Sequence, residues 1–390
     1  MKNSYSPLLV ASMLLAVPQL LSAQEALRFQ TVGSGPHVNP DSTVTLSVHA
    51  PQARAVEVSG FGAAPLAMQS VADGGDWIVT TPKLRPDLYT YSFNIDGVRT
   101  IDPANVYIAR DINALFSEVI VPGGHADLYS VQSVPHGTVS KVWYDSPALG
   151  MTRRMTVYTP AGYEDSVSRR YPVFYLLHGM GGDEEAWSQL GRAVQILDNL
   201  IASGEAEPMI LVMPNGNAGL AAAPGETSAG MYEPKGEHSR AEEGRFENSF
   251  RDIIDYVDSH YRTIADKSHR AIAGLSMGGG HAFRTSLMMP DTFDYVGILS
   301  GATHWKGGAP DGSEKDLTAA LGRQFADAPR LYWIAIGKDD FLYDLNRSYR
   351  TMLDELDIPY EYHESDGGHI WSNWRDYLVI FTPRLFKNAE

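Results

Sequence analysis

The stretch from Ala271 to Phe283, AIAGLSMGGGHAF, places a single serine among glycines directly after an apolar run. Gly274, Ser276 and Gly278 fit the pattern G-x-S-x-G, which forms a sharp strand-to-helix turn and exposes the serine hydroxyl. The flanking residues must be small, because the turn brings the strand and the helix close together. Since an apolar strand precedes the pattern and a helix is expected after it, Ser276 is the candidate nucleophile.

A serine hydroxyl is a weak nucleophile at neutral pH, so a base must take its proton and a carboxylate must orient that base. After such a turn the chain order is serine, acid, histidine, each following a successive strand. His369, in DGGHIW after the last expected strand, fits the base, and Gly367 and Gly368 let the imidazole reach across to the serine. Three other histidines fit worse: His281 in the expected helix, His363 inside a strand, and His304, a weak competitor on a loop.

The acid should follow the strand RLYWIAIG, where the chain continues Gly337-Lys338-Asp339-Asp340-Phe341. Only one of the two adjacent carboxylates can face the histidine. Asp340 is preferred, with Asp339 as the alternative and Asp344 and Asp366 as more remote ones.

The tetrahedral intermediate of acyl transfer also requires hydrogen-bond donors for its oxyanion. The backbone N–H of Met277, directly after the nucleophile, is expected to be one of them. The other should come from HGMGG after the strand YPVFYLLHG, with Met180 preferred over Gly179. His178 in the same loop is interpreted as shaping the loop rather than as a base.

The elements that must hold these residues begin near residue 137. Apolar segments such as YPVFYLLHG, PMILVMPNG, YVGILSG and RLYWIAIG alternate with amphipathic helical stretches near 184–203, 246–261, 278–289 and 343–356. Continuous apolar strands are typical of burial on both faces. The pattern predicts a mostly parallel sheet covered by helices, the α/β-hydrolase fold or a close relative.

Residues 43–121 follow a different pattern, with short alternating runs such as VTLSVHAP, AVEVSGF and LYTYSFNIDG between turn residues. Their spacing of about ten residues predicts an antiparallel β-sandwich. Tyr89, Tyr91 and Phe93 share one strand face, and we expect them in the core rather than stacked on sugar rings. The predicted division is a sandwich over 24–125, a linker over 126–136 and a catalytic domain over 137–390.

Composition narrows the classes of partner. The net charge of −16 argues against nucleic acid or an anionic membrane surface as the ligand. Residues 1–23 are typical of a signal peptide, with Lys2, an apolar run broken by Pro18, and Ala23 at the expected cleavage site. This pattern predicts a secreted or periplasmic protein without a membrane span. The chain has no cysteine, so disulfides and thiolate metal sites are excluded.

Two sets of motifs carry family resemblances. The chain over roughly residues 137–388 resembles the esterase D-like group, and within it carbohydrate esterase family 1, the feruloyl and acetyl xylan esterases. The motifs that carry this resemblance are LLHGMGGDEEAW, MPNG, FENSF, HRAIAGLSMGG, GKDDFLY and GGHIWSNWRDYL. That resemblance implies nucleophile Ser276, acid Asp340, base His369 and oxyanion donors Met180 and Met277. The first part of the chain resembles carbohydrate-binding module family 48 in the segments VHAPQARAVEVSGF and DGGDWIVTTPKLRPDLYTYSFNIDGVRTIDPAN. This resemblance implies an immunoglobulin-like early-set sandwich over most of 28–122, but it does not necessarily imply sugar binding.

A long polar segment lies between Asn215 and Phe246, and loops of this length are usually lids, binding loops or disordered. We expect it to border the acyl or sugar site. The expected apolar walls are Met231, Tyr232, Trp305 and Trp371.

Together these observations predict an exported serine esterase that removes feruloyl or acetyl groups from xylan-type plant polysaccharide or feruloylated oligosaccharide, without metal or cofactor. The alternatives are a siderophore-type or general carboxylesterase, and a glycan-binding protein with an inert hydrolase domain. The acidic composition and the first domain favour a glycan substrate. The sequence alone does not separate feruloyl from acetyl preference.

Overall fold

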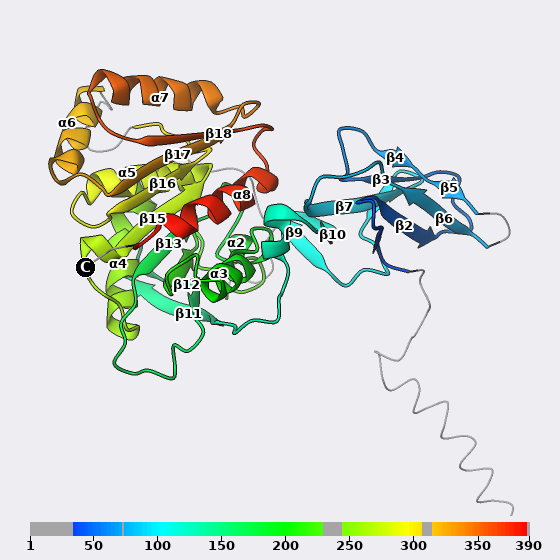
Figure 1. Ribbon diagram of the computed structural model, residues 1–390, viewed down its shortest axis with the longest axis horizontal. Helices are drawn as coiled ribbons and strands as arrows, with labels where there is room; N and C mark the ends of the chain where they lie inside the picture. The colour runs from blue at the N-terminus through cyan, green and yellow to red at the C-terminus, as the bar shows by residue number, and fades with distance from the viewer. Residues whose placement is uncertain (1–33, 72–73, 229–243, 306–313, 388–390) are drawn as a thin grey trace, which may run out of the picture.

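A computed structural model describes residues 34–71, 74–228, 244–305 and 314–387 (Figure 1). The chain forms an all-β part from its N-terminal third and a larger α/β part from the remainder. The predicted signal peptide over 1–23 lies outside the described residues and stays a prediction. Within the part of the chain that is described, no helix combines the length and the apolar character needed to cross a membrane.

Two antiparallel sheets build the N-terminal part. One has the order β1-β2-β6-β5, and the other has the order β4-β3-β7-β10-β9 with β8 also paired to β7. Their bounds are β1 His37–Val38, β2 Val44–His49, β3 Val56–Ser59, β4 Leu66–Ala67, β5 Gln69–Ser70, β6 Asp76–Thr80, β7 Asp87–Ile95, β8 Val98–Thr100, β9 Ile108–Asp111 and β10 Ala114–Val121.

Alternate residues of both sheets meet in one core. Leu46 of β2 and Val58 of β3 lie in the same buried cluster as Tyr91 and Phe93 of β7. Neither of these two aromatic rings is exposed, and Phe61 packs on Tyr91 with ring centroids 5.5 Å apart. The aromatic stripe on β7 therefore supports the core between the sheets, as its spacing predicts.

The α/β part is organised around one sheet with the order β11-β12-β14-β13-β15-β16-β17-β18. Its strands are β11 Thr138–Ser146, β12 Met151–Thr159, β13 Val173–Leu177, β14 Ile210–Pro214, β15 Arg270–Leu275, β16 Tyr295–Leu299, β17 Leu331–Gly337 and β18 Glu361–Ser365. From β14 to β18 neighbouring strands are parallel, whereas β11 and β12 pair antiparallel. The mostly parallel sheet confirms the predicted arrangement.

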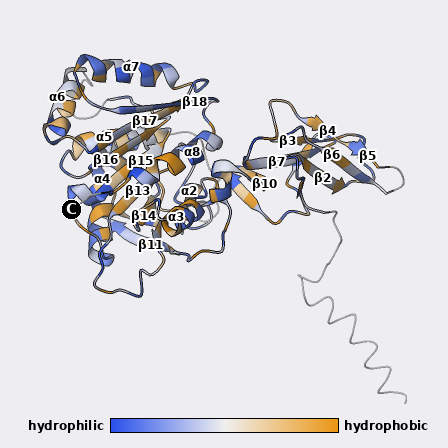
Figure 2. Cartoon of the chain, in the orientation of Figure 1, coloured by the Kyte–Doolittle hydropathy of each residue, from blue (hydrophilic) through white to orange (hydrophobic). Residues whose placement is uncertain are grey.

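Helices cover both faces of this sheet. Along β13, Tyr175 and Leu177 face a core shared with α4 (Arg245–His260), α5 (Met277–Met288), α6 (Glu314–Gln324) and α7 (Tyr343–Glu355). Phe174 and Leu176 face the opposite core, shared with α3 (Ala193–Ala202) and α8 (Trp371–Phe381). Figure 2 shows the apolar residues gathered in the central strands and a largely hydrophilic α7 at the edge.

The predicted helices at 246–261, 278–289 and 343–356 are observed as α4, α5 and α7. The helix predicted over 184–203 is divided into α2 (Ala186–Gln189) and α3, with Arg192 at φ +53° between them. The sequence interpretation did not include α6, α8, β11 or β12.

The two parts are joined by a packed connection rather than by a free linker. The 3-10 helix η2 (Gly124–Tyr129) overlaps the predicted linker, and its Ala126 and Tyr129 are buried in the α3 and α8 core. Arg375 of α8 donates to the carbonyl oxygens of Leu88 and Leu190 at 2.8 and 2.9 Å and pairs with Asp87 at 3.0 Å. This guanidinium therefore holds β7 of the first part against the second.

Candidate active site

The turn between β15 and α5 presents Ser276 in a strained backbone conformation. Ser276 has φ +55° and ψ −117°, and it is the only residue of 271–280 that is not buried. A Cβ on Gly274 would meet the carbonyl oxygen of Gly278 at 2.4 Å, and a Cβ on Gly278 would meet that of Leu177 at 2.4 Å. Both glycines are therefore required by close backbone approach, and the strain serves to expose the hydroxyl.

His369, in the loop between β18 and α8, contacts a carboxylate from the loop after β17. Its Nδ1 lies 3.0 and 2.9 Å from Oδ1 and Oδ2 of Asp340, whose side chain is fully buried. The alternative acids are exposed: Asp339 faces solvent, Asp366 pairs with Lys338, and Asp344 pairs with Arg347. Of the four acids considered from the sequence, the structure brings Asp340 to the histidine.

The Asp340 carboxylate is held in its ionised form. Burial alone would raise the pKa of the Asp340 carboxyl, but hydrogen bonds from His369, the Leu342 N–H and the Ser300 side chain lower the pKa below its usual value. A carboxylate at Nδ1 keeps the proton on that nitrogen and leaves Nε2 of His369 free to act as a base.

The loop after β13 lies against the serine turn. A Cβ on Gly179 would meet Cδ1 of Leu275 at 2.5 Å and Cβ of Ser276 at 3.3 Å. The next residue, Met180, lines the same pocket as Ser276. Met277 is the first residue of α5, where a backbone N–H has no partner within the helix.

His178 joins this loop to the segment that follows β14. It is buried, its Nδ1 lies 2.7 Å from the carbonyl oxygen of Gly179, and its Nε2 accepts the N–H of Gly216 at 2.7 Å. Burial lowers the pKa of His178 to about 4. The imidazole is therefore neutral with its proton on Nδ1, and it shapes the loop instead of acting as a base.

The neutral His178 predicts a stability that depends on pH. Between its ordinary pKa of 6.5 and the folded value of about 4, the unfolded chain binds a proton that the folded chain does not. The free energy of unfolding is therefore expected to fall by up to roughly 3 kcal/mol as the pH drops through this window. Urea unfolding at pH 7 and pH 4.5 should show a smaller decrease in His178→Gln than in the wild type. A matched change at exposed His260 should keep the wild-type decrease, and equal decreases in all three proteins would contradict the prediction.

The other histidines have structural contacts. Nδ1 of His281 lies 2.8 Å from Glu247, which also accepts from Arg284 at 2.5 Å, so this helix residue belongs to a buried ionic cluster. Burial alone would raise the pKa of Glu247, but His281 and Arg284 lower the pKa far below its usual value. His363 stacks on Trp333 with ring centroids 5.8 Å apart. His304 is exposed and is not among the described residues that line the pocket.

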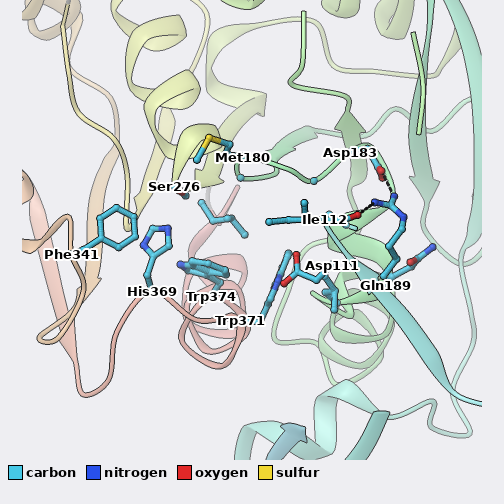
Figure 3. Close-up of a pocket in the computed structure, with 16 residues that line it drawn as sticks. Asp111, Ile112, Met180, Asp183, Gln189, Ser276, Phe341, His369, Trp371 and Trp374 are labelled. Carbon is cyan, nitrogen blue, oxygen red and sulfur yellow. Dashed lines mark hydrogen bonds and ion pairs between the residues drawn. The ribbon is translucent and has the colours of Figure 1, made fainter. Parts of the chain in front are cut away.

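Ser276 and His369 open into one cavity of about 250 Å³ (Figure 3). Apolar and aromatic side chains border it on the catalytic side: Met180, Leu275, Phe341, Trp371 and Trp374. Arg110, Asp111 and Ile112 border it from the N-terminal part. Trp371 is thus a lining residue as predicted, while Trp374, Phe341 and the three residues of the N-terminal part were not anticipated.

Trp305 does not take the predicted position in the pocket wall. It packs against Phe283 of α5 with ring centroids 6.1 Å apart, and it does not occur among the described lining residues. Met231 and Tyr232 lie outside the described residues. The first part of their segment is anchored by Arg153, which donates to the carbonyl oxygens of Asn215 and Asn217 at 2.7 Å, and Asn217 donates to the carbonyl oxygen of Gly182 at 2.8 Å.

The spacing of Trp374 offers a signal that the sequence interpretation did not use. Trp371 and Trp374 are three residues apart, which places both on one face of α8. Phe341 directly follows Asp340, and its ring centroid lies 4.4 Å from that of His369.

Across the described residues, no group of three or more histidine, aspartate or glutamate side chains is arranged to hold a metal ion.

Comparisons with known proteins match most of the α/β part to esterases. The family model described as putative esterase matches residues 146–385. An endo-1,4-β-xylanase/feruloyl esterase of Xylanibacter ruminicola is 35% identical over 276 residues, which are 69% of this chain and 36% of the relative. The chain thus spans about a third of the length of that relative.

Solved structures match over two different extents. A ferulic acid esterase is 29% identical with a TM-score of 0.51, covering 65% of this chain and 99% of the other. The enterobactin esterase of Shigella flexneri is only 19% identical, but it has a TM-score of 0.64 and covers 91% of this chain and 96% of the other. The second likeness concerns the fold alone, and its extent includes residues of the N-terminal part.

Proposed function

Because the chain belongs to the putative esterase family, we propose that it is a serine carboxylic ester hydrolase that releases feruloyl groups from xylan-type plant polysaccharide or feruloylated oligosaccharide. The observation that carries the reaction class is the contact of His369 with buried Asp340 at the edge of the cavity that Ser276 also lines. The feruloyl preference is supported by the aromatic lining and by the names of the relatives.

The proposed reaction uses side chains and backbone N–H groups of this chain together with one water molecule. Oγ of Ser276 attacks the ester carbonyl carbon while Nε2 of His369 takes the hydroxyl proton, and Asp340 stabilises the resulting imidazolium. The backbone N–H groups of Met180 and Met277 donate to the oxyanion of the tetrahedral intermediate. When that intermediate collapses, the imidazolium returns the proton to the departing sugar oxygen. Water then attacks the acyl-serine by the same route and releases the acid.

An aromatic acyl group fits the cavity better than acetyl. Trp371 and Trp374 lie edge to face with ring centroids 5.2 Å apart, and the Trp374 ring lies 4.9 Å from that of His369. Phe341 is 75% exposed beside the base, so the entrance also offers an aromatic surface. Acetyl would leave most of this surface without contact, whereas a cinnamoyl ring would bury it.

The N-terminal part is assigned in the same proposal. We infer that residues 24–125 form an immunoglobulin-like module of the carbohydrate-binding family 48 type, which is supported by two antiparallel sheets around one core. The pattern of residues 1–23 supports export to the periplasm or the medium. The catalytic domain then begins near residue 137, where β11 starts.

The substrate assignment predicts a clear preference among esters. We expect kcat/KM for methyl ferulate to exceed that for methyl acetate by about 10- to 100-fold, because the feruloyl ring would bury one of its faces in the cavity. The measurement is initial rates on both methyl esters, together with release of ferulate from feruloylated xylo-oligosaccharide and acetate from acetylated xylan. Equal methyl ester rates, with no ferulate released, would favour a general carboxylesterase, and rapid cleavage of a catecholate siderophore ester alone would favour the siderophore-type alternative.

A further inference from the structure

The hairpin of β9 and β10 carries part of the N-terminal part into the catalytic pocket. Asp111 pairs with Ala114 across the hairpin, so Ile112 and Asn113 form its two-residue turn. Arg110, Asp111 and Ile112 line the same cavity as Ser276 and His369. Figure 3 shows Ile112 and Asp111 facing the cavity from the side opposite Ser276 and His369.

Ile112 packs directly on the loop that borders the serine turn. A Cβ on Gly181 would meet Cγ1 of Ile112 at 2.6 Å, so the loop admits the isoleucine only because residue 181 has no side chain. Ile112 itself has φ +53°. A β-branched residue is an outlier in that conformation, where a hairpin turn would favour glycine or asparagine. The backbone strain at Ile112 accompanies an apolar side chain placed in the pocket wall.

The hairpin is anchored at this position by an arginine. Arg110 donates to the carbonyl oxygen of Ile112 at 2.8 Å and forms an ion pair with Asp183. Asp183 is buried, and its other carboxylate oxygen accepts the N–H of Glu185 at 3.0 Å. The position of Ile112 is therefore set by the loop that also carries Met180.

Asp111 supplies a polar group at the end of an aromatic surface. The rings of His369, Trp374 and Trp371 follow one another with centroid distances of 4.9 and 5.2 Å, and Asp111 lies beside Trp371 in the pocket lining. An acyl group that reaches Asp111 must therefore extend past both indoles, which acetyl does not do. Burial raises the pKa of the Asp111 carboxyl, and the neighbouring Arg110 and Trp371 partly offset this rise.

We propose that Asp111 and Ile112 are specificity-determining residues, contributed by the N-terminal part, for a hydroxylated aromatic acyl group. Ile112 packs on the face of the acyl ring, and Asp111 accepts a hydrogen bond from the ring hydroxyl at the far end of the pocket. The inference rests on the proposed function, because it takes Ser276 as the point where the acyl carbonyl is held.

The test uses three esters: methyl ferulate; methyl 3,4-dimethoxycinnamate, in which only the ring hydroxyl is capped; and nitrophenyl acetate, which has a small acyl group and a different alcohol. Asp111→Ala is expected to lower kcat/KM for ferulate about 10-fold more than for the capped ester, the effect of one hydrogen bond to a charged group. Asp111→Asn keeps an acceptor oxygen and should recover part of this loss. The loss of kcat/KM on nitrophenyl acetate should be smaller than the loss on ferulate in both variants, since acetyl does not reach Asp111.

Ile112→Gly removes the side chain at a backbone angle that glycine adopts freely, so the variant should remain folded. It is expected to lower kcat/KM for both cinnamoyl esters about 5- to 20-fold and to lower that for nitrophenyl acetate by a clearly smaller factor. Asn113→Ala, at the exposed neighbouring turn position, is the matched control and should change none of the three rates. Thermal unfolding by circular dichroism checks that each variant is folded.

Two outcomes overturn the proposal. Unchanged rates in Asp111→Ala and Ile112→Gly would show that the hairpin does not contact the acyl group. Equal losses of kcat/KM on all three esters would show a general effect on packing. A wild type that does not prefer ferulate would contradict the proposed substrate instead. In that case nitrophenyl acetate, butyrate and octanoate test the hairpin alone: Ile112→Gly, which removes an acyl contact, should lower kcat/KM for the octanoate more than for the acetate, and an unchanged preference would overturn the role of Ile112.

Discussion

Ser276→Ala is expected to reduce kcat by roughly 10⁴- to 10⁶-fold on both methyl ferulate and nitrophenyl acetate. The substitution removes the atom that attacks the carbonyl, and water held in the same site is a far slower nucleophile without the covalent intermediate. The measurement is a full progress curve at high enzyme concentration with freshly separated protein. Comparable and negligible rates in wild type and variant would support the glycan-binding alternative with an inert hydrolase domain.

A second substitution at the same position separates chemistry from backbone strain. Ser276→Gly should be as inactive as Ser276→Ala, but more stable than it by about 1 kcal/mol, because only glycine adopts φ +55° with ψ −117° without steric cost. Urea unfolding of both variants gives this difference. If the alanine variant were equally stable, the turn would store no strain and the conformation of Ser276 would need another explanation.

Asp340→Asn is expected to reduce kcat by roughly 10²- to 10⁴-fold with little change in KM. The asparagine amide can donate to Nδ1 of His369, which would move the imidazole proton to Nε2, the nitrogen that must accept the serine proton. The loss of the buried negative charge also removes stabilisation of the imidazolium. Steady-state kinetics on methyl ferulate measure both effects.

The neighbouring residue provides the control for this substitution. Asp339→Asn makes the same chemical change one position away. The Asp339 residue is exposed, and its backbone N–H donates to the carbonyl oxygen of Gly367. We expect its kcat to stay within about threefold of wild type. A large loss in the Asp339 variant, with a small one in the Asp340 variant, would reverse the assignment of the acid.

The candidate catalytic residues could be found from the sequence because their signals are local. Ser276 is identified by the glycines beside it, and Asp340 and His369 each follow a predicted strand that is buried along its whole length or packed at the sheet edge. Parallel strands end at the same edge of a sheet, so residues far apart in the chain are brought together by the strand pattern alone. Asp340 is preferred over Asp339 from the sequence, although adjacent residues have the same strand signal, and the structure places the Asp340 carboxylate against His369.

Elements that depend on distant partners were missed. β12 begins MTRRM, and two arginines do not predict a buried strand, yet Arg154 is buried because Glu184, Glu185 and Glu226 accept from it at 2.7 to 2.8 Å. Such charges are stable in the interior only when paired, and no local pattern shows the pairing. The contact between Ile112 and the pocket loop is also long-range, because Ile112 and Gly181 are about 70 positions apart in the chain.

Trp305 shows the opposite error. An aromatic residue on a loop after a strand was expected to line the site, but its ring instead extends the core at Phe283. Residue type and approximate location indicate apolar contact, but they do not tell which apolar surface is contacted.

The position of Arg375 has a consequence for how the chain can be divided. It is only 2% exposed, and two of its acceptors, Asp87 and the carbonyl oxygen of Leu88, belong to the other part of the molecule. A fragment starting at residue 137 would lose these acceptors, together with the buried Tyr129 ring of η2, and would leave Arg375 with the Leu190 carbonyl oxygen as its remaining acceptor. We therefore expect the catalytic part to be less stable without the N-terminal part, and an exchanged N-terminal part to fit only if its partner surface moves with it.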